Sequence, residues 1–172
     1  MSKREDILDL ACFMPVGIEL GVAEGVFSEL VLRNKAVKHW YSVDMWAGDR
    51  GHDVNQYKKA LNKLLPFRDQ NTVLRMTFSE AVDLFPDEFF DFIYIDGYAH
   101  TGQDDGKTLN EWWPKLKTGG VFAGDDYDPR WPKTVSVVNS FMAKHNQELT
   151  VFKFTEEVGG WSSYPSWYTI KE

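Results

Sequence analysis

Short apolar runs alternate along the chain with longer stretches that mix apolar and polar positions. Five of the runs have the length and composition of strands covered on both faces, and they span residues 16–20, 38–43, 72–76, 90–95 and 121–124. The stretches around them predict helices over residues 24–35, 54–65, 79–84, 109–116 and 133–146. This alternation is typical of βα units around a mostly parallel sheet.

Two further β-rich runs lie near the C-terminus, at residues 149–155 and 166–170, and the stretch between them contains Gly159 and Gly160. They predict an antiparallel hairpin at one edge of the sheet. The whole pattern predicts an α/β fold: a Rossmann-like, doubly wound, seven-stranded sheet with helices on both faces. Because the 172 residues contain no repeat or long linker, we expect a single domain over residues 1–172.

Composition narrows the function classes. The net charge of −7 disfavours nucleic-acid partners, since binding to phosphates depends on clustered Lys and Arg. Cys12 is the only cysteine, so an intramolecular disulfide is excluded and a reducing compartment is expected. No run of about 18 apolar residues occurs, so no membrane partner is expected. We therefore expect a soluble, cytoplasmic protein, with a homo-oligomer left open.

The first candidate site is the turn after the first predicted strand, Glu-Leu-Gly-Val-Ala-Glu-Gly at residues 19–25. Glycine lets a backbone approach a ligand closely, and the start of a helix presents free N–H groups. A dinucleotide site usually shows G-x-G-x-x-G, whereas this turn has only Gly21 and Gly25. Glu19 would also repel phosphates and suits a cationic ligand. A plain βα turn without a ligand remains the alternative.

Acidic residues follow three of the other predicted strands. Asp44 ends the second strand, where a carboxylate can accept hydrogen bonds from both hydroxyls of a ribose. Asp96 follows the fourth strand, and Asp125 and Asp126 follow a Gly-Gly turn and the fifth strand. Open α/β sheets bind ligands outside the carboxyl ends of their strands. We therefore expect these acids to meet in one crevice.

Four motifs in this order resemble those of the class I S-adenosylmethionine-dependent methyltransferases. They are the turn at residues 19–25, the Asp at residue 44, Ile-Asp-Gly at residues 95–97 and Lys-Thr-Gly-Gly-Val-Phe-Ala-Gly-Asp-Asp-Tyr at residues 117–127. The chain resembles more narrowly the branch that includes sugar and macrolide O-methyltransferases, and at a greater distance the catechol-type enzymes. The resemblance runs from about residue 16 to residue 127.

The resemblance implies a set of cofactor-binding residues. Glu19, Gly21, Val22 and Gly25 would hold the methionine portion of S-adenosylmethionine, and Asp44 would hold the ribose. Met45 or Trp46 would cover one face of the adenine. The adenine edge is expected at residues 77–80, with Thr77 and above all Ser79 as contacts. Asp96 would line the same site.

In metal-dependent relatives, acidic ligands come from the ends of the fourth and fifth strands, and Asp96, Asp125 and Asp126 match them. A hard divalent cation such as Mg²⁺ suits oxygen ligands and would lower the pKa of a bound hydroxyl. The alternative for the last two acids is to cap the following turn. As a ligand of this metal ion, Asp96 is also expected to take part in catalysis.

His100 is the candidate general base, because imidazole titrates near neutral pH. Relatives often carry Asp-Gly-x-His, whereas residues 96–100 are one residue longer, and a solvated loop histidine is the alternative. Among the other histidines, only His52 is expected to reach the crevice.

The leading hypothesis is methyl transfer from S-adenosylmethionine to a hydroxyl of a small molecule, such as a sugar or another diol, assisted by a divalent metal. A nicotinamide-dependent oxidoreductase is the first alternative, and it would need glycines that the first turn lacks. A catalytically inactive nucleoside-binding module is the second alternative. Methylation of nucleic-acid nitrogens is disfavoured, because Asp-Pro-Arg-Trp-Pro at residues 128–132 does not match the motif of those enzymes.

Overall fold

A computed structural model of the chain describes residues 4–33, 36–47, 51–152 and 164–172. In this part, seven strands form one sheet in the order β3-β2-β1-β4-β5-β7-β6. The strands are β1 (Val16–Leu20), β2 (His39–Asp44), β3 (Asn71–Arg75), β4 (Phe90–Ile95), β5 (Leu116–Gly124), β6 (Thr150–Phe152) and β7 (Ser166–Ile170). The first five strands pair in parallel, and β7 is antiparallel to both of its neighbours. The predicted doubly wound sheet and the antiparallel pairing of its two C-terminal strands are confirmed. Gly159 and Gly160, the expected turn between these strands, lie outside the described residues.

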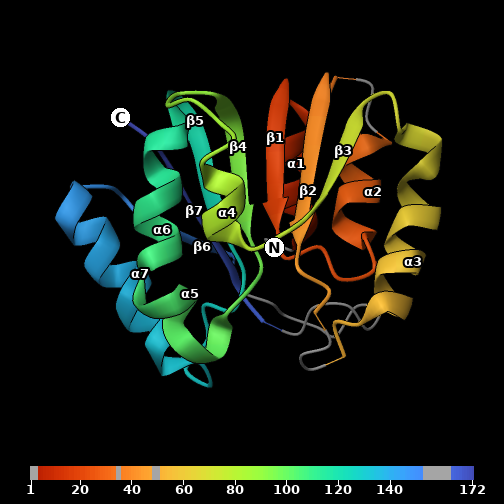
Figure 1. Cartoon of the computed structure of the whole chain (residues 1–172). Helices are drawn as coiled ribbons and strands as arrows, with labels where there is room; N and C mark the ends of the chain where they lie inside the picture. The colour runs from red at the N-terminus through yellow and green to blue at the C-terminus, as the bar shows by residue number, and fades with distance from the viewer. Residues whose placement is uncertain (1–3, 34–35, 48–50, 153–163) are drawn as a thin grey trace.

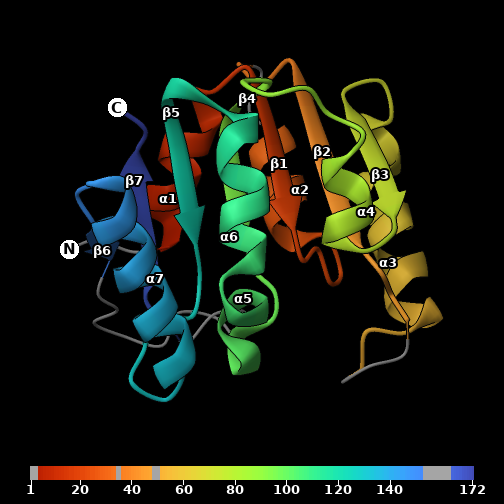
Figure 2. The same cartoon turned by 60° about the vertical axis from the view of Figure 1, so that its left-hand side comes forward.

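Helices cover both faces of this sheet (Figures 1 and 2). On one face lie α1 (Arg4–Cys12), α2 (Val26–Leu32) and α3 (Val54–Leu64), and on the other α4 (Phe78–Val82), α5 (Gly102–Asp105), α6 (Lys107–Trp112) and α7 (Pro132–His145). Each layer buries its own apolar cluster against the sheet. Strand β4 serves both clusters, because Phe92 and Tyr94 face α2 whereas Ile93 and Ile95 face the opposite layer.

The sequence pattern predicted the bounds of most elements to within a few residues. Two differences between the predicted and the observed elements have clear physical causes. Helix α1 was not predicted, although Ile7 and Ala11 are spaced to lie on one face of a helix and are fully buried. Strand β5 begins at Leu116 rather than Val121, because the Gly-Gly turn is a bulge within the strand. Gly119 adopts φ of +79° in that bulge.

The loops that follow β1, β2, β4 and β5 all emerge at the carboxyl ends of the parallel strands. Asp53 caps the start of α3, because its side chain accepts hydrogen bonds from the backbone N–H groups of Asn55 and Gln56, both at 2.9 Å. Across the described ranges, no helix is long and apolar enough to cross a bilayer.

Candidate functional site

A cavity of about 410 Å³ opens at the carboxyl ends of β1, β2, β4 and β5, and its volume is typical of a small-molecule site. Eight residues that the sequence predicted line it: Gly21, Asp44, Met45, Trp46, His52, Asp96, His100 and Asp126. Six others do not: Glu19, Val22, Gly25, Thr77, Ser79 and Asp125. The remaining lining residues are Ala23, Ala47, Phe78, Gly97, Tyr98, Ala99, Trp131 and Tyr164. The expected crevice is present, but part of its wall differs from the expectation.

The turn after β1 is held tightly between the neighbouring strands. The backbone N–H of Gly21 donates to the Val43 carbonyl at 2.9 Å, and the N–H of Asp96 donates to the Leu20 carbonyl at 2.8 Å. Gly21 adopts φ of +102°, and a Cβ at this position would lie 2.0 Å from the Asp96 carbonyl oxygen. Only glycine therefore allows the turn to pass this close to the end of β4. Gly25 instead directly precedes α2 and does not line the cavity.

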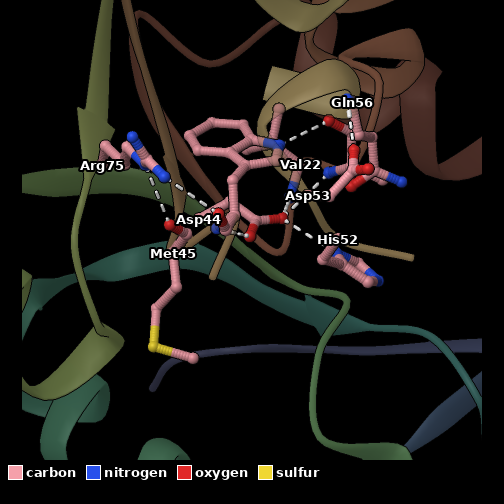
Figure 3. A network of polar contacts seen from close by, with 9 residues as sticks. Val22, Asp44, Met45, His52, Asp53, Gln56 and Arg75 are labelled. Atoms are coloured by element: carbon pink, nitrogen blue, oxygen red, sulfur yellow. Dashed lines mark hydrogen bonds and ion pairs between the residues drawn. The ribbon is translucent and has the colours of Figure 1, made fainter. Parts of the chain in front are cut away.

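Asp44 ends β2 and lines the cavity, where its carboxylate makes several polar contacts (Figure 3). Its carboxylate is 6% exposed, and its Oδ2 atom accepts from the backbone N–H groups of Val22 and Ala23, both at 3.0 Å. Its Oδ1 atom accepts from the N–H of Trp46 at 3.0 Å, and His52 Nδ1 lies 3.5 Å from Oδ2. Burial raises the pKa of the Asp44 carboxyl, but the hydrogen bond with His52 and the backbone N–H donors outweigh burial and hold the pKa below its usual value. The carboxylate is therefore ionised and rigidly placed at neutral pH.

Met45 and Trp46 were the two alternatives for the adenine face, and they lie differently. The Trp46 indole is buried, and its N–H donates to the Ala23 carbonyl at 2.8 Å. Arg75 donates to the carbonyl oxygens of Met45 and Trp46, at 3.2 and 3.0 Å. The Met45 side chain extends away from this network (Figure 3). The geometry favours Met45 as the residue that would cover the adenine face. Trp46 instead stabilises the turn after β1 through its hydrogen bond to Ala23.

Glu19 lies beneath the turn and not on the cavity. The side chain is 2% exposed and accepts a hydrogen bond from the Ser28 hydroxyl on α2. The Ser28 hydroxyl also lies 2.7 Å from the Ser42 hydroxyl and accepts from the Trp40 indole N–H at 2.9 Å. Glu19 thus belongs to a buried polar network between β1 and α2, and its contact with a ligand stays a prediction.

Replacing Ser28 with alanine tests how much this network stabilises the fold. The change removes a hydroxyl that serves Glu19, Trp40 and Ser42, so the free energy of unfolding should fall by about 1–3 kcal/mol. Urea unfolding measures the loss. The exposed Ser136 on α7 provides a matched control, and Ser136→Ala should change stability by less than about 0.5 kcal/mol. Equal effects of the two substitutions would show that the network contributes no stability.

Phe78, rather than Ser79, faces the cavity from the start of α4. Ser79 donates its hydroxyl to Glu111 on α6 at 2.9 Å, which draws it away from the cavity. Thr77 caps α4 in a reciprocal pair with Glu80. A Thr followed three residues later by Glu is the sequence signature of this capping box. That signature could have placed Thr77 and Phe78 correctly.

The three aspartates of the expected Mg²⁺ site are not gathered as a ligand set. Asp125 is 4% exposed, does not line the cavity and accepts from the Ser166 hydroxyl on β7 at 3.0 Å. Asp96 and Asp126 do line the cavity. Within the described ranges, no three His, Cys, Asp or Glu side chains are grouped as metal ligands. The donor set therefore does not fit the expected three-aspartate site, because β7 brings a serine that engages Asp125.

Aromatic residues form the opposite wall, around His100. The exposed His100 side chain meets the Trp131 ring edge-on, with centroids 4.3 Å apart and an angle of 76°. Trp131 contacts Tyr164 at 5.5 Å, and the Arg130 guanidinium lies over the Tyr164 ring at 4.3 Å. Trp131 and Tyr164 carried no sequence signal, since they come from the start of α7 and the residues before β7.

The chain belongs to a methyltransferase-domain family. Residues 17–127, more than half of the chain, match the family model described as a methyltransferase domain. A curated relative, the uncharacterized protein y4gI of Sinorhizobium fredii, is 26% identical over 119 residues, and the match covers 67% of this chain and only 13% of that protein.

Solved structures share the fold at low sequence identity. The O-methyltransferase of Bacillus cereus in complex with SAH superposes with a TM-score of 0.71 at 14% identity, covering 99% of this chain and 83% of that one. The precorrin-6y C5,15-methyltransferase of Geobacter metallireducens gives 0.73 at 16% identity, covering 98% and 87%. These similarities establish the class I methyltransferase fold, in agreement with the family model.

Proposed function

We propose that the chain transfers the methyl group of S-adenosylmethionine to a hydroxyl of a small molecule. The observation that carries the proposal is the division of one cavity into two parts. One part, at the end of β2, contains the ionised Asp44 carboxylate and the apolar Met45, and Phe78 lines the cavity from the start of α4. The part beyond β4 contains His100 beside Trp131 and Tyr164. A nucleoside cofactor and an acceptor can therefore lie side by side.

The cofactor part of the cavity suits S-adenosylmethionine better than a dinucleotide. Asp44 would accept the ribose hydroxyls, and Met45 and Phe78 would contact the adenine. The N–H groups of Val22 and Ala23, which a pyrophosphate would need, are already bonded to Asp44. This occupation weighs against the nicotinamide-dependent alternative.

When bound, S-adenosylmethionine supplies an activated methyl group, and the residues of the chain provide alignment and proton transfer. Most of the acceleration would come from holding the acceptor oxygen in line with the methyl carbon, which converts a bimolecular step into a unimolecular one. His100 would accept the hydroxyl proton. Asp96 and Asp126 on the cavity wall disfavour an anionic acceptor, so a neutral polyol or another neutral hydroxyl compound fits best.

Two measurements test this function in sequence. Calorimetric titration with S-adenosylhomocysteine (SAH), the demethylated product, should show binding, whereas NAD should not bind. Mass spectrometry of hydroxylated metabolites incubated with protein and S-adenosylmethionine should then reveal one methylated product. Binding without any methylated product would support the inactive nucleoside-binding module instead.

The Mg²⁺ site stays a prediction, and the geometry argues against its three-aspartate form. With Asp125 bonded to Ser166, only Asp96 and Asp126 of the expected ligands face the cavity. We therefore expect turnover to survive treatment with a chelator such as EDTA. Turnover that disappears with the chelator and returns with added Mg²⁺ would restore metal assistance. Asp126→Asn would then be expected to weaken the response to Mg²⁺.

A further inference from the structure

Three nitrogen atoms lie around one oxygen of the Asp44 carboxylate. Oδ2 faces the backbone N–H groups of Val22 and Ala23, both at 3.0 Å, and His52 Nδ1 at 3.5 Å. The two backbone N–H groups match the two lone pairs of this oxygen, and His52 makes a third, longer contact with it. A ribose hydroxyl that approaches Oδ2 from the cavity would make this third contact in the place of the imidazole.

The two backbone donors are fixed in place. Within the turn, the Gly25 N–H donates to the Val22 carbonyl at 2.8 Å. The Trp46 indole N–H holds the Ala23 carbonyl at 2.8 Å. His52, in contrast, reaches Asp44 with a side chain that is 42% exposed at the cavity rim. Rotation of this side chain is the movement that opens its place beside Oδ2 without breaking the turn.

We propose that the His52 imidazole occupies the place of a ribose hydroxyl on Asp44, so that nucleoside binding displaces it and is coupled to the loss of its proton. The inference rests on the proposed role of Asp44 as the ribose carboxylate. An imidazolium binds a carboxylate by a charge-assisted hydrogen bond, which is stronger than the bond from a neutral imidazole. Protons therefore compete with the cofactor for the same oxygen.

The surroundings of His52 make the imidazole the group that controls this competition. The other charged groups on the described elements nearby are Asp53 and Lys59 of α3, Glu24 before α2, Arg75 at the end of β3, and Asp96, Asp126 and His100 around the cavity. Lys59 pairs with Glu24 at 2.7 Å, and Arg75 bonds to backbone carbonyls. The hydrogen bond from the Gln56 N–H, followed by those from Asn55, holds the pKa of Asp53 below its usual value, so Asp53 remains ionised. Imidazole is the side chain that ordinarily changes charge between about pH 5 and 8.

The test is calorimetric titration of the full chain with SAH between about pH 5.5 and 8. For the wild type, affinity should fall as the pH falls, by up to about tenfold per pH unit once the imidazole is protonated. His52→Gln keeps a neutral donor and His52→Ala removes it, and both should lose this dependence. At the acid end, both variants should bind SAH more tightly than the wild type. Titrations in two buffers of different ionisation enthalpy should show that the wild type releases more protons on binding than either variant.

His39→Gln is the matched control. Its imidazole bonds to Thr72 at 2.9 Å and does not line the cavity, so this variant should retain the wild-type pH profile. Comparison with the control separates His52 from any titration of SAH itself. A wild-type affinity that does not vary with pH, or a slope that persists in His52→Gln, would overturn the inference while leaving the methyltransferase proposal intact. Absence of SAH binding to the wild type would overturn both.

Discussion

Replacing Asp44 with alanine is expected to remove most of the cofactor affinity and to destabilise the fold. Hydrogen bonds to a charged group contribute about 1.5–3 kcal/mol, so loss of the ribose contacts should weaken SAH binding by about 10- to 150-fold. The N–H groups of Val22, Ala23 and Trp46 also lose their acceptor. Each buried, unsatisfied donor costs about 1–3 kcal/mol, and the free energy of unfolding should fall by several kcal/mol. Calorimetry and urea unfolding measure the two losses.

Asp87→Ala provides the surface control for this experiment. Asp87 is exposed and pairs with Lys115 at 2.8 Å, and exposed ion pairs contribute about 0–1 kcal/mol. Its loss should leave SAH affinity unchanged. If Asp44→Ala lowered stability but left SAH affinity unchanged, the carboxylate would serve only the turn, and its assignment to the ribose would be wrong.

The stability that Asp44 contributes should also depend on pH. The pKa of its carboxyl is lower in the folded protein than its usual value, so the folded state binds the proton less readily than the unfolded state. The stabilisation is therefore fully present above the usual pKa and is lost as the pH falls through the folded-state pKa. The difference in stability between wild type and Asp44→Asn should accordingly shrink as the pH falls below about 4.

His100→Ala is expected to lower kcat by about 10²- to 10⁴-fold, the usual contribution of a general base. SAH affinity should stay within about twofold, because His100 lies beside Trp131 on the wall opposite Asp44. The loss should become smaller at high pH, where solvent can accept the proton. Rates with the acceptor found by mass spectrometry, taken from about pH 6 to 9, provide the measurement.

Asp105→Asn is the control for this loop. Asp105 is exposed, its carboxylate lies 3.7 Å from the Lys133 ammonium group, and it does not line the cavity. The neighbouring Lys107 does not line the cavity either. Neither residue is therefore placed to replace His100 as the base. A His100→Ala variant with wild-type kcat throughout this range would make His100 a solvated loop residue. The role would then pass to Asp126 on the same wall.

The sequence alone determined the architecture and the location of the site. Apolar runs and helical spacing identified β1 and β4 to the residue, and the bounds of α3 to within one residue. Because parallel strands present their carboxyl ends at one edge, residues that follow different strands, such as Gly21, Asp44 and Asp96, were expected to meet there. The cavity confirms this expectation.

Which side chains face the cavity depends on how the layers pack. Glu19, Ser79 and Asp125 all lie near the predicted edge, yet each is drawn away by a hydroxyl or carboxylate from another element: Ser28, Glu111 and Ser166, respectively. Trp131 and Tyr164 become neighbours because α7 and β7 pack beside β5. The spacing of residues sets strands and helices because the period of each element is local. The direction of a side chain depends on partners up to 41 positions away, whose proximity arises only when the layers pack.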